Sequence, residues 1–327
     1  MRKKWVGVMI FSGIICSWVL GTSVFAQQKF RIGTGIDPVY SNFYVADAMG
    51  LYKKYGVDAE LKLFSRGGEA LDALMAGEIH VTSNAEYPNI IAVDKNPEVI
   101  IVGVSCVAPH TMKLTARSEI KKPQDFIGKK IGSALGSVTD YCFDKYFEKN
   151  GVDKSKVIYV NVAAPESVPL LDKGDITAFF FWEPWPSKAV EVSGDKVHIL
   201  GSSAQLGVYA AKLFIAVPKS YAEKNPETIK GFFKALTEAG EYLHQNPQEA
   251  YKLVAKKIPT LTPETITKMT VDFSHRPRFL KEDLKNLDDV ATWVTGKGKI
   301  KKVPDWKSAV VTKYLKAVNP KAVDAGL

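Results

Sequence analysis

Cysteine, histidine and catalytic sequence motifs are scarce in this chain. Only 3 of its 327 residues are cysteine and 5 are histidine, and the histidines do not show the spacing of metal ligands. The sequence contains no His-Glu-x-x-His, Gly-x-Ser-x-Gly or Walker A motif. Residues 33–38 carry only part of a dinucleotide fingerprint, because Pro38 replaces its third glycine. These absences argue against the corresponding enzymes, predict no metal or other cofactor, and favour a binding site.

No apolar run has the length of a membrane span. The run at residues 6–20 is shorter than the roughly 20 residues that cross a bilayer, and it follows a basic start at residues 2–4. Small residues then lead to Ala26, so we predict a cleavable signal peptide at residues 1–26 and a periplasmic protein. In that oxidising compartment Cys106 and Cys142 either form a disulfide or stay as buried thiols.

The charged residues favour a solvated surface over a nucleic-acid interface. The chain has 44 Lys and Arg against 35 Asp and Glu, a formal net charge of +9, and 46% hydrophobic residues. Its lysines are scattered along the sequence, and the one dense basic block is at residues 297–302. We therefore predict a globular protein that does not bind nucleic acid. The length favours about two domains.

Three short motifs occur twice, in the same order and separated by 95 to 99 residues. They are Ile-Gly within 30–34 and 129–133, Gly-Val-Asp within 52–58 and 147–153, and Gly-acid-Ile within 74–79 and 171–176. One such match has little weight, but three in order predict a duplication. We therefore expect two similar α/β lobes.

Alternating β-rich and helical segments support this plan. The expected strands are 29–34, 59–64, 79–82, 99–104, 130–133, 157–162, 176–181, 197–200 and 212–217, and the expected helices of the first half are 41–55, 69–76 and 87–94. An apolar stripe in the C-terminal part, Phe232, Leu236, Ala239 and Leu243, predicts a helix that packs on the first lobe. We expect residues 27–115 plus 212–327 in the first lobe and 116–211 in the second, joined by a two-strand hinge near Thr115 and 209–212.

Ligands of open α/β sheets bind beyond the carboxyl ends of the strands, so the segments after the expected strands are candidates. A glycine and hydroxyl run at 136–139 is either an anion cradle or a plain helix N-cap. Arg66, between a serine and two glycines, is either a clamp for a carboxylate or sulfonate or a surface arginine.

Two acids and two tryptophans complete the candidate segments. Glu86 and Glu183 are separated by 97 residues and hold the same position in the two halves. Paired acids suggest a ligand with an amine or other hydrogen-bond donors. Trp182 and Trp185 either stack on a ligand or pack in the core.

Several ordered segments together resemble one known family. The leader, the strand and loop at 32–40, the helix end at 50–58, the stretches 73–79 and 123–132, and the Trp-Glu-Pro turn at 182–184 are similar to the nitrate/sulfonate/taurine group of ABC-transporter substrate-binding proteins. That group also contains binders of thiamine pyrimidine precursors. The resemblance implies an α/β type II periplasmic binding fold, a monomer whose two lobes close on a small molecule, and an ABC transporter permease as partner.

The resemblance also implies ligand-binding residues. They are Asp37, Tyr40, Ser41, Arg66, Asn84, Glu86, Ser137, Thr139, Trp182 and Glu183. An aminosulfonate, a sulfonate or a related anion is the expected ligand, with a thiamine pyrimidine precursor or an aromatic carboxylate as alternatives. The competing classes are an enzyme like the pyrimidine synthases, whose cysteine-rich run is missing here, and a ligand-sensing module for a membrane receptor.

Overall fold

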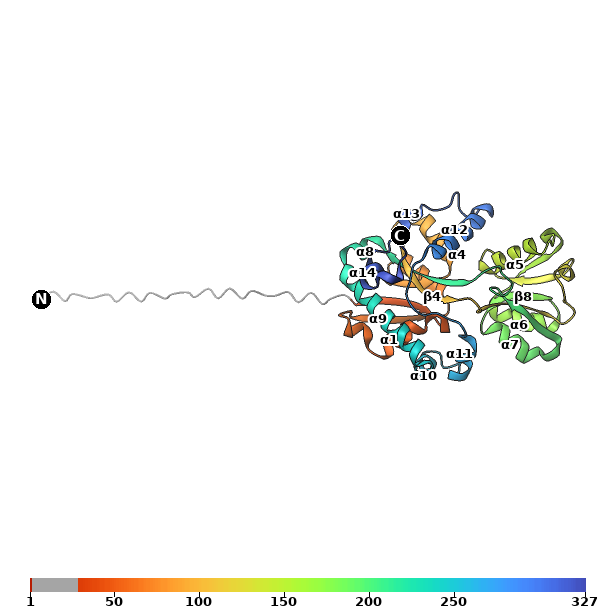
Figure 1. The fold of residues 1–327 in the computed structure, drawn as a ribbon, viewed down its shortest axis with the longest axis horizontal. Coiled ribbons are helices and arrows are strands. Elements are labelled where there is room, and N and C mark those ends of the chain that lie inside the picture. Colours follow the sequence, from red (N-terminus) through yellow and green to blue (C-terminus); the bar gives the residue numbers. More distant parts are fainter. Residues whose placement is uncertain (2–28) are drawn as a thin grey trace.

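Two five-stranded sheets organise the chain, as the computed structural model shows for residue 1 and residues 29–327 (Figure 1). The predicted signal peptide lies outside the described residues, apart from Met1. The first sheet has the order β2-β1-β3-β10-β4 and contains β1 (Phe30–Gly35), β2 (Ala59–Phe64), β3 (Val81–Asn84), β4 (Val99–Ala108) and β10 (Ala211–Pro218). The second has the order β7-β6-β8-β5-β9 and contains β5 (Met112–Arg117), β6 (Lys130–Ser133), β7 (Ile158–Asn161), β8 (Ala178–Trp182) and β9 (Val197–Ser202).

The two sheets share one topology. In each, three strands run parallel, and the fourth strand in spatial order is antiparallel to both of its neighbours. That antiparallel strand is β10 in the first sheet and β5 in the second, and each is the first strand after the chain has crossed from the other sheet. Each crossing therefore ends inside the sheet that it enters.

The strand pairs locate the two crossings. We call residues 29–108 together with 211–327 the first lobe and residues 112–202 the second lobe; the linkers are 109–111 and 203–210. Thr115, where we expected the first crossing, lies inside β5 and pairs with Phe179 and Ile199. The first crossing therefore comes earlier than expected, because residues 112–117 form a strand that was not among those predicted.

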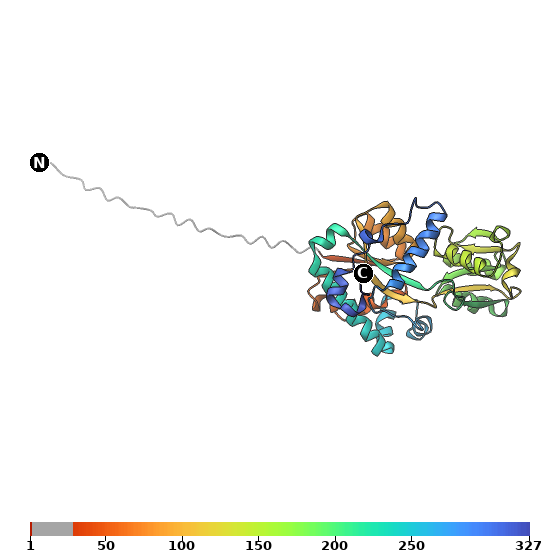
Figure 2. The ribbon, with the colours of Figure 1, turned by 45° about the horizontal axis from the view of Figure 1, so that its top comes forward.

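Helices cover the faces of both sheets (Figures 1 and 2). Those of the first lobe are α1 (Ser41–Ala48), α2 (Leu51–Lys54), α3 (Gly67–Met75), α4 (Glu86–Lys95), α8 (Lys219–Lys224), α9 (Pro226–Gln245), α10 (Pro247–Lys257), α11 (Pro263–Met269), α12 (Lys281–Gly296), α13 (Trp306–Ala309) and α14 (Lys313–Val318). Those of the second are α5 (Val138–Lys149), α6 (Ala164–Lys173) and α7 (Trp185–Ser193). The single helix expected at 41–55 is divided into α1 and α2, because Gly50 adopts a left-handed φ of 67°. Within residues 29–327, none of the helices has the length and apolar character to cross a bilayer.

The repeated motifs of the sequence have repeated structural roles. Three glycine pairs carry them: Gly33 and Gly132, Gly56 and Gly151, and Gly77 and Gly174. A Cβ on either glycine of the first pair would collide with the isoleucine of its own lobe's Gly-acid-Ile motif, Ile79 or Ile176. The second pair has φ values of 74° and 64°, and the third 76° and 85°, which favour glycine. The duplication is therefore present in the backbone.

The C-terminal third completes the first lobe. The predicted apolar stripe of α9 is buried, and the Phe232 ring lies 5.7 Å from that of Phe30 and 5.9 Å from that of Phe43. The expectation that this helix packs on the first lobe is thus confirmed. Cys106 in β4 and Cys142 in α5 are buried free thiols in different lobes, so they do not form a disulfide.

Candidate functional site

Three loops of the first lobe meet around Gly67, the first residue of α3. The Tyr40 hydroxyl donates to the carbonyl of Ser83 at 3.0 Å. A Cβ on Gly67 would collide with the Tyr40 hydroxyl and would lie 2.5 Å from the side-chain amide of Asn84, whose nitrogen donates to the carbonyl of Ser83 at 3.2 Å. The structure therefore brings Tyr40 and Asn84 together, and the glycine permits their close approach.

Asp37 caps the turn that follows β1, and the charge of Glu183 in the second lobe has a minor effect on its pKa. In this 3-10 turn, Pro38–Tyr40, its Oδ1 accepts from the amide of Val39 at 2.9 Å. Burial raises the pKa of Asp37 to about 7 against the lowering effect of that hydrogen bond, and the charge of Glu183 raises it further. The loops after β1 and β8 therefore lie within electrostatic reach of each other.

Glu86 lies where the first lobe, the second linker and the second lobe meet. It begins α4, its side chain is buried, and one carboxylate oxygen accepts from the hydroxyl of Tyr209. The other oxygen has no hydrogen-bond partner among the described residues. Burial raises the pKa of Glu86 to about 8, although Tyr209 and Lys212 oppose the rise. The Tyr209 ring also lies edge-on to Tyr141 of α5, with 6.0 Å between the ring centres.

Glu183, at the matching place in the second lobe, has a full set of partners. The ammonium group of Lys113 donates to its Oε1. The Ser187 hydroxyl donates to the same oxygen at 2.8 Å, and the Ser187 amide donates to Oε2 at 3.2 Å. Lys113 lies in β5, so this partner could not be predicted while that strand was missed. No regular alternation could have indicated the strand, because Leu114, Thr115 and Ala116 are all buried.

Trp182 is the last residue of β8 and is half-buried. Its ring stands edge-on to that of Phe181 at 5.6 Å, and its backbone pairs with Met112. Two exposed apolar side chains occupy equivalent places after β1 and β6: Ile36 is 46% exposed and Leu135 is 50% exposed. In both lobes, therefore, apolar surface lies beside the polar groups at the carboxyl ends of the parallel strands.

The N-terminus of α5 is a capped helix end. The Ser137 hydroxyl accepts from the Thr139 amide at 3.2 Å, and the buried Thr139 hydroxyl bonds Ser133 at 2.7 Å. The Gly136 amide donates to the carboxylate of Asp140 at 2.6 Å. This geometry fits the N-cap interpretation of residues 136–139. The carboxylate of Asp140 occupies the position at this helix N-terminus that a bound anion would take. Asp140 was not among the residues predicted from the sequence.

Two of the ten expected residues point elsewhere. The side chain of Arg66 is 72% exposed, and the nearest opposite charge is that of Glu69 at 3.4 Å, one turn along α3. The hydroxyl of Ser41 is buried and donates to the carbonyl of Pro38 at 2.6 Å. Ser41 therefore stabilises the turn before α1.

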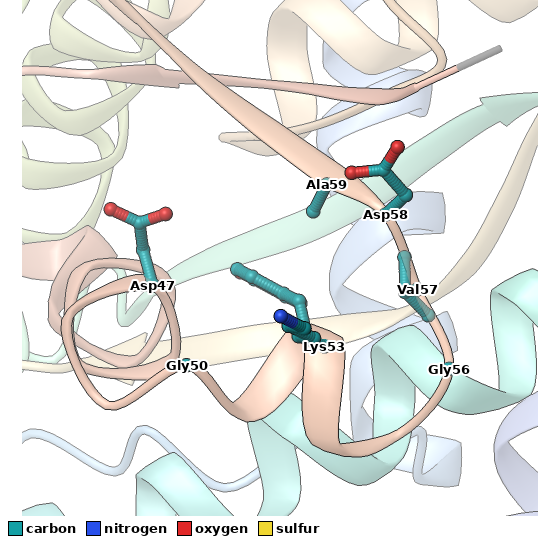
Figure 3. A pocket seen from close by; sticks show the side chains of 8 residues that line it. Asp47, Gly50, Lys53, Gly56, Val57, Asp58 and Ala59 are labelled. Atoms are coloured by element: carbon teal, nitrogen blue, oxygen red, sulfur yellow. The ribbon is translucent and has the colours of Figure 1, made fainter.

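A hollow of the first lobe lies at the edge of the first sheet that β2 forms (Figure 3). It has a volume of about 460 Å³ and is lined by Asp47, Lys53 and Asp58, among others. Ala59, the first residue of β2, also lines it, so it lies at the amino end of that strand. Asp47 is already paired with Lys257 at 2.7 Å. This hollow is separate from the loops that carry the candidate residues.

Comparison with known proteins identifies the family of this chain. Residues 37–250 match the family model described as NMT1/THI5 like. The chain belongs to the NMT1/THI5-like family. The matched region begins at Asp37 and includes every candidate residue of both lobes.

The relatives of this NMT1/THI5-like chain include binding proteins. It is 26% identical over 197 residues to the taurine-binding periplasmic protein of Escherichia coli, with 60% of each chain covered. It is 24% identical over 216 residues to a putative aliphatic sulfonates-binding protein of the same organism, with 65% of each chain covered. The chain thus matches about 60% and 65% of the lengths of these two curated relatives.

A solved structure shows the same fold. The periplasmic aliphatic sulphonate binding protein SsuA from Escherichia coli superposes with a TM-score of 0.75 at 21% identity, covering 87% of this chain and 92% of its own. The fold is therefore the α/β periplasmic-binding-protein fold of two similar lobes that the resemblance implied.

Proposed function

We propose that this protein is an exported solute-binding protein that captures a small organic anion between its lobes for uptake by an ABC transporter. The observation that carries the proposal is the close approach of segments that follow strands of different lobes, because a Cβ on Gly136, after β6, would lie 3.5 Å from the hydroxyl of Tyr87, after β3. A ligand placed there contacts both lobes and favours the arrangement in which they are close. The names of the taurine- and sulfonate-binding relatives support this function.

The ligand that fits the described groups has a sulfonate or related anion and an apolar or amino-bearing part. Ile36, Leu135 and the half-buried Trp182 suit hydrocarbon. Asp37 and Glu86, whose pKa values are raised to about 7 and about 8, accept from an amine when ionised and donate to an anion when protonated. We propose an aminosulfonate or alkanesulfonate. The exposed part of Trp182 also favours a ring, so a thiamine pyrimidine precursor or an aromatic carboxylate is the second candidate.

We propose a binding role without turnover, because the nucleophiles described here are shielded. Burial raises the pKa of both Cys106 and Cys142 well above the usual value, so neither thiol is activated. Ser202, His110 and Asp272 do lie in a row near the first linker, with a Ser202–His110 hydrogen bond of 2.7 Å. However, the Ser202 hydroxyl also accepts from the Gln205 amide at 3.2 Å, and Asp272 lies 3.6 Å from the imidazole, beyond hydrogen-bond distance, so the three residues do not form a hydrogen-bonded triad.

A ligand screen followed by calorimetry tests the proposal. Taurine, alkanesulfonates, an aminopyrimidine and aromatic carboxylates are screened by thermal shift, and the true ligand raises the melting temperature by mass action. Trp182→Ala should weaken its binding about tenfold, the equivalent of ~1.4 kcal/mol, and Glu183→Gln should also weaken it. Glu191→Gln, an exposed acid of the same lobe that pairs with Lys188, is the control.

Two results would contradict the proposal. One is a ligand that binds equally well to the wild type, Trp182→Ala and Glu183→Gln. The other is chemical conversion of the bound compound by the purified protein, followed by mass spectrometry, which would favour the synthase-like alternative.

A further inference from the structure

We propose that Trp293 and Lys297, at the C-terminal end of α12 in the first lobe, bind Asp144 of the second lobe and form an interlobe latch. We call these three residues the latch. It lies outside both linkers and stabilises the arrangement in which the lobes are close. The proposal concerns the position of the lobes, and it rests on the proposed function only for its effect on ligand binding.

The helix α12 is firmly anchored in the first lobe. Near its start, Asp283 pairs with Lys212 of β10 at 2.8 Å, and the side chains are 0% and 8% exposed. Its apolar face, which includes Leu287, Val290 and Val294, is fully buried. The helix packs against α4 and lies beside the second lobe (Figure 2). Its far end therefore moves with the first lobe.

Asp144 of α5 contacts the C-terminal end of α12. The indole N–H of Trp293 donates to its carboxylate at 3.0 Å, and the Lys297 ammonium lies at 2.7 Å. Lys154 and Tyr159 of its own lobe, each at 3.0 Å, complete the set. The Asp144 side chain is only 6% exposed. Separation of the lobes would break the two bonds from the first lobe, and water would replace them only in part, so separation loses the net energy of these charged hydrogen bonds.

Burial acts to raise the pKa of Asp144, yet the hydrogen bonds from Lys297, Trp293 and Lys154 lower it below its usual value. The carboxylate is thus held in its charged form by groups from both lobes. The aromatic contacts agree with this arrangement, since the Trp293 ring lies edge-on to Tyr141 of α5 at 5.5 Å and to Tyr87 of α4 at 6.2 Å.

The latch lies near the loops that carry the candidate residues. Beside it is a hollow of about 330 Å³, lined by residues of α5 and the following turn together with Trp293. The loops near the candidate site are close in the same arrangement, because a Cβ on Gly136 would lie 3.5 Å from the Tyr87 hydroxyl. Since Tyr87 also contacts Trp293, the latch favours the arrangement that brings the candidate loops together. Loss of the latch should shift the ligand-free population toward separated lobes.

The primary test needs no ligand. Donor and acceptor dyes on Lys224→Cys in α8 and Glu191→Cys in α7, both exposed, report the distance between the lobes by FRET. Cys106 and Cys142, the native thiols of residues 29–327, are buried. Trp293→Phe combined with Lys297→Met removes the two donors and keeps the ring and the aliphatic stem. The expected result is a longer and broader distance distribution in the ligand-free protein. Lys285→Ala, whose ammonium pairs with Asp289 on the same helix, is the control and should change nothing.

An unchanged distance distribution in the double variant, with Lys297→Met alone as a second check, would overturn the latch. When the screen yields ligands, the double variant should bind all of them more weakly by one common factor, on the order of tenfold, because the latch residues do not touch the ligand. Unchanged or tighter binding, or factors that differ between ligands, would also overturn it. A screen without any ligand would instead contradict the proposed function and leave the distance measurement valid.

Discussion

Glu86 and Glu183 hold the same place in two lobes of one topology, but their surroundings are opposite. Glu86 has a tyrosine hydroxyl as partner of one oxygen, no hydrogen-bond partner for the other within residues 29–327, and a pKa raised to about 8. Glu183 has a lysine ammonium and both a hydroxyl and an amide from Ser187. The duplication thus conserved the position of the acid while its partners diverged. One lobe presents a carboxyl that holds a proton near neutral pH, and the other presents an ion pair.

The largest expected effect comes from removing the lysine of that ion pair. Lys113→Met should lower the free energy of unfolding by about 3 kcal/mol, because it leaves the 3% exposed carboxylate of Glu183 without a counter-charge. Urea denaturation at pH 7 measures this. Lys113→Met combined with Glu183→Gln should recover part of the loss. Equal stability of the wild type and Lys113→Met would show that the ion pair is dispensable and would weaken the contrast with Glu86.

A smaller effect is expected from the pH dependence of Glu86. Its pKa is raised from 4.5 to about 8 in the folded protein, so the stability it contributes is complete below about pH 4.5 and is lost as the pH rises through about 8. Glu86→Gln should therefore become more stable relative to the wild type as the pH increases, by roughly 2 kcal/mol between pH 6 and 8. Denaturation of both proteins across this range measures the difference. A constant difference at every pH would mean that Glu86 is ionised throughout.

The smallest expected effect concerns the equivalent glycine turns of the two lobes. Gly77→Ala and Gly174→Ala each place a Cβ at a φ of 76° or 85°, and each should destabilise the protein by about 1 kcal/mol. A Cβ on Gly77 meets open space, and one on Gly174 meets only Arg117 at 3.5 Å, so strain of the backbone dominates in both. Clearly unequal losses in thermal denaturation would show that the two turns are not equivalent.

The sequence predicted those features of the fold that are encoded locally. The glycines at 77 and 174 and the Ile-Gly pairs revealed two lobes, because each of them controls a turn or a close contact within its own lobe. The strand β5 was missed, and with it the partner of Glu183. Its middle residues, Leu114, Thr115 and Ala116, are all fully buried, so the strand lacks the regular alternation that identifies half-buried strands.

The candidate site was predictable as a set of positions and not as a set of interactions. The candidate segments do follow strands, as predicted, while their role in binding stays a prediction. The partners of their side chains come from distant parts of the chain: Tyr209 reaches Glu86 across 123 residues, and Trp293 reaches Asp144 across 149. No periodicity or motif spacing carries such pairings, since they depend on how the completed lobes lie against each other.

The placement of β10 between β3 and β4 has a consequence for the order in which the protein matures during synthesis. Every strand of the second sheet comes from one continuous stretch, residues 112–202, which can assemble as soon as it emerges from the ribosome. The first sheet is incomplete between β3 and β4 until residues 211–218 have been synthesised, and helices α8 to α14 follow later still. The first lobe, whose N-terminal strands are translated first, is therefore completed after the second lobe.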